Sequence, residues 1–159
     1  MSVIRIRFVA NSSFISRGIR AVTGSLWSHV ESWDFRKQMW ISAYSQGIAL
    51  MPWNYANESR IALYEIPCTE EEFNVFHDAA EADLGVKYNW LDIAGLLIQD
   101  RSLTSAHRLM CAQANTKWLL KTFGAARVLN CAFGWEYRIT PEILHLSPIF
   151  VGHLKRQLN

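Results

Sequence analysis

Four segments near the start of the chain constrain its fold more than any other feature. In these segments, apolar and polar side chains alternate, or β-branched and aromatic residues dominate. The segments are 3–10, 28–35, 39–45 and 60–67. Such segments are typical of β-strands that place one face on a core. A short polar connection, "RKQ", separates the second segment from the third and predicts an antiparallel hairpin. We therefore expect one antiparallel sheet.

Helical patterns flank and follow these strands. Residues 11–24 offer an asparagine or serine N-cap and Gly24 as a stop. "TEEEF" matches a capping box, in which Thr69 and Glu72 satisfy each other's backbone amides at the start of a helix that runs toward Leu84. Three further helical patterns lie at 89–98, 107–124 and 139–146. Early strands and late helices indicate the α+β class, with helices packed on the sheet.

Length and composition favour a single domain that covers residues 1–159. The sequence is 50% hydrophobic and 13% aromatic, which is enough for a substantial core, and no repeat or linker interrupts it. Lys and Arg total 16 against 14 Asp and Glu, and the basic residues are scattered. This balance indicates neither a nucleic-acid partner nor an anionic membrane surface, and it leaves the oligomeric state open.

We expect neither an export signal nor a membrane-spanning segment. "MSVIRIRFVANSSF" lacks the continuous apolar core of a secretion signal, because Arg5 and Arg7 interrupt it. The most apolar run, Trp90–Ile98, holds nine residues, one of them an aspartate, whereas a spanning helix needs roughly 20. We expect a cytoplasmic protein that meets its target there or after release.

Three cysteines at long spacings favour neither a disulfide framework nor a zinc site, so no metal is expected. A nucleophilic cysteine needs a lowered pKa, because only the thiolate attacks. Cys68 is followed by the acidic run 70–72, and Cys131 has apolar neighbours. Cys111 lies near a predicted helix start without a neighbouring acid and is the best candidate of the three. A free cysteine is nevertheless most often a small buried hydrophobe.

A histidine and a glutamate lie two positions apart in the second strand segment. Because strand side chains alternate between faces, His29, Glu31 and Trp33 share one face. A possible base therefore lies beside a carboxylate. His29 alone is more often a packing residue than a catalyst, so Cys111 and His29 need a reason to meet in space.

A resemblance supplies that reason. The segments "SHVESW", "WISAYSQGIALMPW", "GVKYNWLDIAG", "MCAQANTKWL" and "RITPEIL" occur in the order seen in circularly permuted NlpC-type, papain-like cysteine hydrolases, the YiiX-like group. The chain resembles a short member of this group over most of its length. The histidine strand precedes the cysteine helix, as permutation requires. Lecithin retinol acyltransferase-like proteins share this arrangement.

The resemblance implies roles for individual residues. Cys111 matches the nucleophile at a helix N-terminus, and His29 matches the base that accepts the thiol proton. Tyr88 falls where relatives carry a tyrosine that helps bind the oxyanion or lines the cleft. Two positions depart from the pattern: Gln113 stands where relatives have the glutamate of Cys-Ser-Glu, at a substrate-binding or oxyanion position, and Ser42 stands where relatives have a glutamate.

Two residues compete to orient the His29 ring. Glu31 faces the same side, with Cβ atoms about 7 Å apart by strand rise, and its charge would stabilise an imidazolium. Ser42 has the family position. A hairpin turn centred on 36–38 would pair Ser42 with Ser32, diagonal to His29. We expect Glu31 to be the electrostatic partner and Ser42 a secondary contact, with a Cys–His dyad as the remaining possibility.

The implied function is a thiol-dependent peptidase or amidase that acts through an acyl-enzyme, on a peptide or cell-wall fragment. It requires neither a metal nor an organic cofactor. A lipid thioesterase or acyltransferase on the same residues is the first alternative. A deep apolar tunnel would favour this alternative, whereas an open groove with polar walls would favour a peptide substrate. A binding module that has lost catalysis is the second, and Ser42 and Gln113 keep it open.

Overall fold

The computed structural model describes residues 2–55, 58–88, 109–128 and 139–158. Its strands and helices follow one another along the chain as β1 (Ser2–Ala10), α1 (Phe14–Thr23), β2 (His29–Asp34), β3 (Met39–Tyr44), β4 (Gly47–Met51), β5 (Arg60–Cys68), α2 (Glu70–Ala82), α4 (Cys111–Phe123), α5 (Ala125–Val128), α6 (Pro141–His145), the 3-10 helix η3 (Pro148–Phe150) and β6 (Leu154–Leu158). The predicted helix at 89–98 lies outside the described residues.

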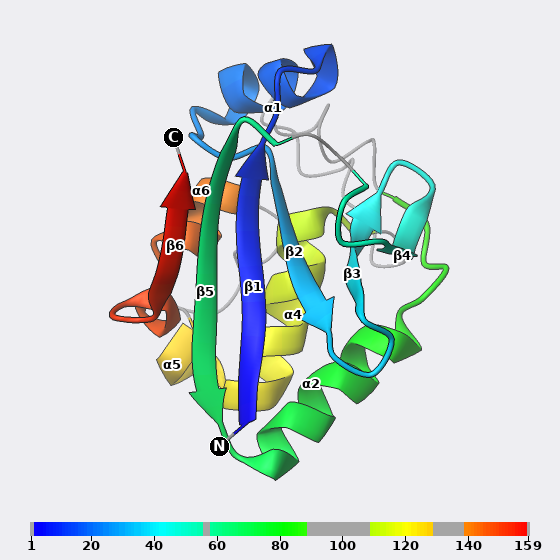
Figure 1. The fold of residues 1–159 in the computed structure, drawn as a ribbon, viewed down its shortest axis with the longest axis vertical. Coiled ribbons are helices and arrows are strands. Elements are labelled where there is room, and N and C mark those ends of the chain that lie inside the picture. The colour runs from blue at the N-terminus through cyan, green and yellow to red at the C-terminus, as the bar shows by residue number, and fades with distance from the viewer. Residues whose placement is uncertain (1, 56–57, 89–108, 129–138, 159) are drawn as a thin grey trace.

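The six strands form one sheet in the order β4-β3-β2-β1-β5-β6, and all neighbours pair antiparallel. In Figure 1, α4 passes behind β1 and β2, α2 crosses the lower end of the same face, and α1 covers the upper end of the sheet. The predicted α+β class, with the Cys111 helix packed on an antiparallel sheet, is confirmed.

Alternation in β1 explains the two faces of the sheet. Ile4, Ile6 and Phe8 are buried on the helix-covered face, while Arg5 and Arg7 lie on the opposite face. The core between sheet and helices is filled by large apolar side chains from several elements, including Trp27, Ile41, Ile66, Phe76, Trp118, Leu119 and Leu144. The central strand therefore separates an apolar core from a charged outer face.

The predicted helix signals are confirmed at both early helices. Ser13 caps α1, and Gly24 ends it with a φ of 62°. The Thr69 hydroxyl accepts from the Glu72 amide at 3.1 Å, and the Glu72 carboxylate accepts from the Thr69 amide at 2.8 Å. Both orphan donors at the start of α2 are satisfied as the capping box predicts.

The hairpin register differs from the expected one. Ser32 pairs with Ile41, not with Ser42. The turn contains four residues, 35–38, because Phe35 leaves the strand and Gln38 takes a positive φ of 56°. One extra turn residue shifts the partner strand by one position.

Strands β4 and β6 were not predicted. Gly47 begins β4 with a φ of 121°, and a Cβ there would lie 2.5 Å from the Val86 carbonyl oxygen. This close approach joins β4 to the end of α2 through the Ile48 amide, which donates to Val86 O at 2.8 Å. Residues 154–157 of the edge strand β6 are exposed, and Lys155 and Arg156 are charged, as is common at the edge of a sheet.

The helix predicted at 107–124 ends as expected at Gly124 but begins only at Cys111, with Met110 as its N-cap residue. Residues 107–108 lie outside the described part. Within that part, no helix is both long enough and apolar enough to cross a membrane.

Candidate active site

Cys111 is the first residue of α4. Met110 before it has an extended backbone, and no acidic residue lies in the first turn. The thiol is buried, with 4% of the residue exposed. Its position places it at the positive end of the helix dipole, which favours the thiolate over the thiol.

The surroundings of Cys111 lower the pKa of its thiol below the usual range. Burial alone would raise the pKa, but the charge of His29 and a hydrogen bond with its side chain outweigh burial, assisted by the backbone amides of Val30 and Ala112. The histidine and the cysteine that the sequence placed in separate halves are thus neighbours. The cluster has the composition needed for a thiolate–imidazolium pair.

His29 is the first residue of β2 and lies against a carboxylate. Its Nε2 atom is 3.5 Å from Oε1 of Glu31. The Tyr44 ring packs against the imidazole with a centroid distance of 5.1 Å. The predicted neighbourhood of His29 and Glu31 is present in the structure.

Glu31 is fully buried and held by two partners that sequence reasoning missed. Arg7 donates from Nε to Glu31 Oε2 at 2.9 Å, and its NH2 nitrogen lies 2.9 Å from the same oxygen. The Tyr55 hydroxyl donates to Oε1. Burial raises the pKa of Glu31, against the charge of Arg7 and the hydrogen bonds from Tyr55 and Arg7. Arg7 faces Glu31 across the β1–β2 ladder, a pairing that the sequence alone does not reveal.

Ser42 lies close to the site but is bound elsewhere. Its hydroxyl donates to the Val30 carbonyl oxygen at 2.6 Å. Asn115 donates to Ser42 Oγ at 3.4 Å, to Val30 O at 3.2 Å and to Cys111 O at 2.8 Å. Sequence reasoning also missed Asn115, although its place four residues after Cys111 puts both on one helix face.

Two pockets adjoin the Cys111–His29 pair. A pocket of about 310 Å³ includes His29 in its wall, and a narrow one of about 20 Å³ includes Cys111. Ser28 and Tyr88 line both. Tyr88 therefore lines the cleft beside the Cys111–His29 pair. Its role in catalysis stays a prediction.

Gln113 has a structural partner at the start of α4. Its Oε1 accepts a hydrogen bond from the Met110 amide at 2.9 Å, which satisfies one orphan donor of the helix. A role of Gln113 toward substrate stays a prediction.

Cys68 has the environment of an unreactive thiol. Burial raises its pKa, and Glu72 and Glu70 raise it further. Cys131 lies outside the described residues. Among the residues that are described, no group of three or more His, Cys, Asp or Glu side chains is arranged to hold a metal ion.

Comparisons with known proteins bear on the fold. No family model matches the chain, and no curated protein matches it. Among solved structures, it is similar to the crystal structure of the metalloprotein YiiX from Escherichia coli O157:H7, with a TM-score of 0.59 and 16% sequence identity over 77% of this chain and 67% of that one. This likeness supports a YiiX-like α+β fold, in which Cys111 and His29 come together from α4 and β2.

Proposed function

We propose that the protein is a cysteine hydrolase that cleaves an amide bond through an acyl-enzyme on Cys111. The observation that carries this proposal is the position of the buried Cys111 thiol at the start of α4, in hydrogen-bonding contact with His29, an arrangement that lowers the pKa of the thiol. Lowered pKa values of buried nucleophiles cluster at functional sites, because an inert buried thiol is normally shifted upward. Cys68 provides the contrast within this chain, since its pKa is raised.

The proposed reaction has two steps. The Cys111 sulfur attacks the substrate carbonyl carbon, and the thiol proton passes to His29, which returns it to the leaving amine as the C–N bond breaks. Water then attacks the thioester, with its proton taken up by His29 and delivered to the departing sulfur. Nε2 of His29 faces Glu31, so we assign Nδ1 to the thiol.

Backbone amides at the start of α4 are the proposed oxyanion donors, since helix N-termini present unpaired N–H groups. Glu31 would hold the His29 ring and place a carboxylate beside the imidazolium that forms when the thiol proton is transferred. Tyr88 would wall the cleft.

The larger pocket combines mainly apolar walls with polar groups that could orient an amide substrate. Its walls contain many hydroxyl and amide side chains, among them Asn11, Ser13, Ser16, Ser45, Gln46 and Tyr55. In ligand pockets of this kind, a few placed polar groups fix the orientation of the ligand, and an amide would use more of them than an acyl chain would. We therefore propose a peptide or cell-wall stem-peptide amide as the substrate class and a long-chain acyl ester as the second candidate.

The test is acylation of the intact protein, followed by mass spectrometry. A small activated ester should acylate Cys111 in the wild type and in Cys68→Ala. The Cys111→Ala variant should stay unmodified, and His29→Ala should be acylated more slowly than the wild type. A panel of short peptides, stem peptides and long-chain acyl thioesters then ranks the substrates. Acylation of Cys68 at the wild-type rate in Cys111→Ala would overturn the assignment, and an unmodified wild type would indicate a binding module.

A further inference from the structure

A buried charge cluster lies behind His29, on the face of the sheet opposite the helices. Arg7 forms its centre and contacts two carboxylates. One guanidinium nitrogen is 2.9 Å from Glu31 Oε2, and another is 2.9 Å from Glu58 Oε1. The side chains of Arg7, Glu31 and Glu58 are only 7%, 0% and 13% exposed. Charges this well shielded from water interact far more strongly than surface charges do.

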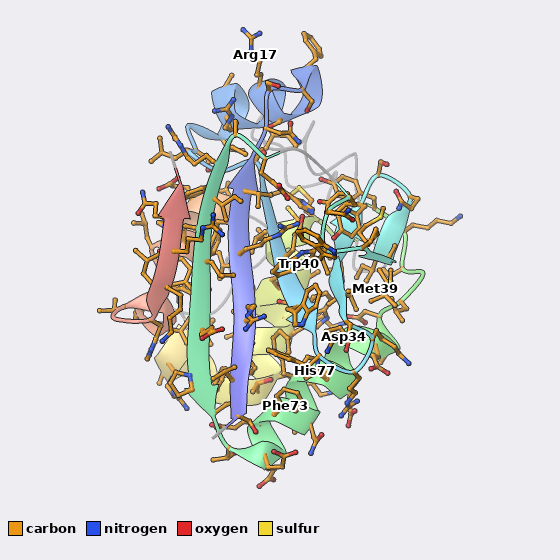
Figure 2. The ribbon with its side chains drawn as sticks, viewed as in Figure 1. Arg17, Asp34, Met39, Trp40, Phe73 and His77 are labelled. Atoms are coloured by element: carbon orange, nitrogen blue, oxygen red, sulfur yellow. The ribbon has the colours of Figure 1, made fainter. Side chains whose placement is uncertain are left out.

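The guanidinium is fixed in its place between the two acids. It stacks over the Trp40 ring at 4.0 Å from the centroid. Trp40 lies on the face of the sheet turned toward the viewer in Figure 2, and its ring contacts the Arg7 guanidinium. The Arg7 guanidinium is thereby held where it contacts Glu31 and Glu58 at the same time.

The charge balance of this cluster reaches His29. With both carboxylates ionised, the two acids exceed the one guanidinium by one negative charge, and Glu31 Oε1 is 3.5 Å from His29 Nε2. Without Glu58, Arg7 would have Glu31 as its one carboxylate partner in this cluster and would offset more of its charge. We propose that Glu58 is a positioning residue: by sharing Arg7, it leaves the Glu31 carboxylate free to stabilise the His29 imidazolium and, through it, the Cys111 thiolate.

Other groups that face His29 carry no competing charge near neutral pH. Tyr44 packs on the ring from β3, and Tyr55 approaches Glu31 from the segment between β4 and β5. Burial and the nearby Glu31 raise the pKa of both phenols, so they stay protonated. Tyr88 lines the same pocket. The cluster and the Cys111 thiolate are then the charges that face the imidazole from the described elements.

The proposal rests on the proposed roles of Cys111 and His29. It adds Glu58, which acts on them through Arg7 and Glu31. Its test is the pH dependence of Cys111 alkylation by iodoacetamide, a rate that requires thiolate but no turnover. Glu58→Gln should raise the pKa of Cys111, so that alkylation near about pH 6 slows by about threefold to tenfold. At alkaline pH, where the thiol is ionised in both proteins, the rates should coincide. A merely structural disturbance would change this alkaline plateau instead.

The chain offers a matched control on the same face of the sheet. Arg5 and Glu65 form an ion pair at 2.6 Å between β1 and β5, and Arg5 stacks near Phe35 at 5.1 Å. Glu65→Gln removes one carboxylate charge from the partner of Arg5, which lies two residues before Arg7 on β1, and should leave the pKa of Cys111 unchanged. Glu58→Asp keeps the charge and should restore most of the wild-type profile.

A double-mutant cycle tests the route of the effect. If Glu58 acts through Glu31, then Glu58→Gln should have no further effect in a Glu31→Gln background. The proposal is overturned if Glu58→Gln leaves the profile unchanged, matches Glu65→Gln, or shifts it equally in both backgrounds. Failure of the proposed function is separate, because the alkylation shift would persist in a protein that never forms an acyl-enzyme.

Discussion

Asn115 lies one helical turn beyond Cys111 and donates a hydrogen bond to the Cys111 carbonyl oxygen at 2.8 Å. Its carboxamide oxygen accepts from the Ser32 hydroxyl at 2.5 Å. Asn115 and Ser32 are both fully buried. One amide side chain therefore joins the start of the cysteine helix to the histidine strand, and the two candidate active-site residues depend on this junction for their mutual position.

We expect Asn115→Ala to reduce the free energy of unfolding by about 2 kcal/mol, because it leaves buried polar groups of β2 without partners. The alkylation rate of Cys111 should change with it. Thr116 is the matched control: it is the next residue, is also buried, and its hydroxyl has no hydrogen-bond partner among the described residues. Thr116→Val should be close to neutral in urea unfolding. Equal losses for the two variants would contradict the role of Asn115.

Cys111 should be alkylated before Cys68 near neutral pH. The pKa of Cys111 is lowered by His29 despite burial, whereas burial and two glutamates raise the pKa of Cys68. Limited iodoacetamide treatment followed by peptide mass mapping measures the order of labelling. Preferential labelling of Cys68 or Cys131 would show that the reactive thiol lies elsewhere.

Local signals in the sequence were sufficient for much of the fold. Alternation in β1, the Thr69–Glu72 box and Gly24 each depend on residues a few positions apart, and the structure contains all three features. Strand β4 was missed because its first residue, Gly47, is shaped by a contact with Val86. The predicted hairpin register was wrong by one position, because Gln38 adopts a left-handed backbone conformation that glutamine does not favour.

Long-range partners account for what was missed near the site. The neighbourhood of His29 and Glu31 follows from strand alternation, so sequence could predict it. Arg7 meets Glu31 only through the β1–β2 ladder, and Tyr55 arrives from another segment. Such pairings depend on sheet order and register, which one sequence without relatives does not specify.

Glu31→Gln should raise the pKa of Cys111 more than Ser42→Ala does. Glu31 presents an oxygen 3.5 Å from the His29 ring, whereas the Ser42 hydroxyl donates to the Val30 carbonyl. Removing the carboxylate charge removes support for the imidazolium, and a hydroxyl already engaged with the backbone supplies little. The measurement is the pH profile of Cys111 alkylation, with His29→Ala as the baseline. A shift in Ser42→Ala without one in Glu31→Gln would favour the family position, and a shift in His29→Ala alone would indicate a dyad.

The stability of the fold should fall as the solution is acidified below about pH 6.5, and His77 should contribute to this fall. His77 lies on α2 and packs against the Phe73 ring at a centroid distance of 4.2 Å, with its Nδ1 atom 3.9 Å from Asp34. Figure 2 shows these three side chains together where α2 meets the sheet. Burial lowers the pKa of His77 from 6.5, an effect that the charge of Asp34 opposes only in part.

A lowered pKa in the folded state means that the unfolded chain binds the proton more readily. The free energy of unfolding contributed by neutral His77 is therefore present above pH 6.5 and is lost as the pH falls toward the folded-state pKa. Urea unfolding at a series of pH values should give a flatter dependence for His77→Phe than for the wild type. Burial also lowers the pKa of His145, so some acid sensitivity should remain in this variant. An unchanged slope in His77→Phe would show that His77 does not take up a proton on unfolding.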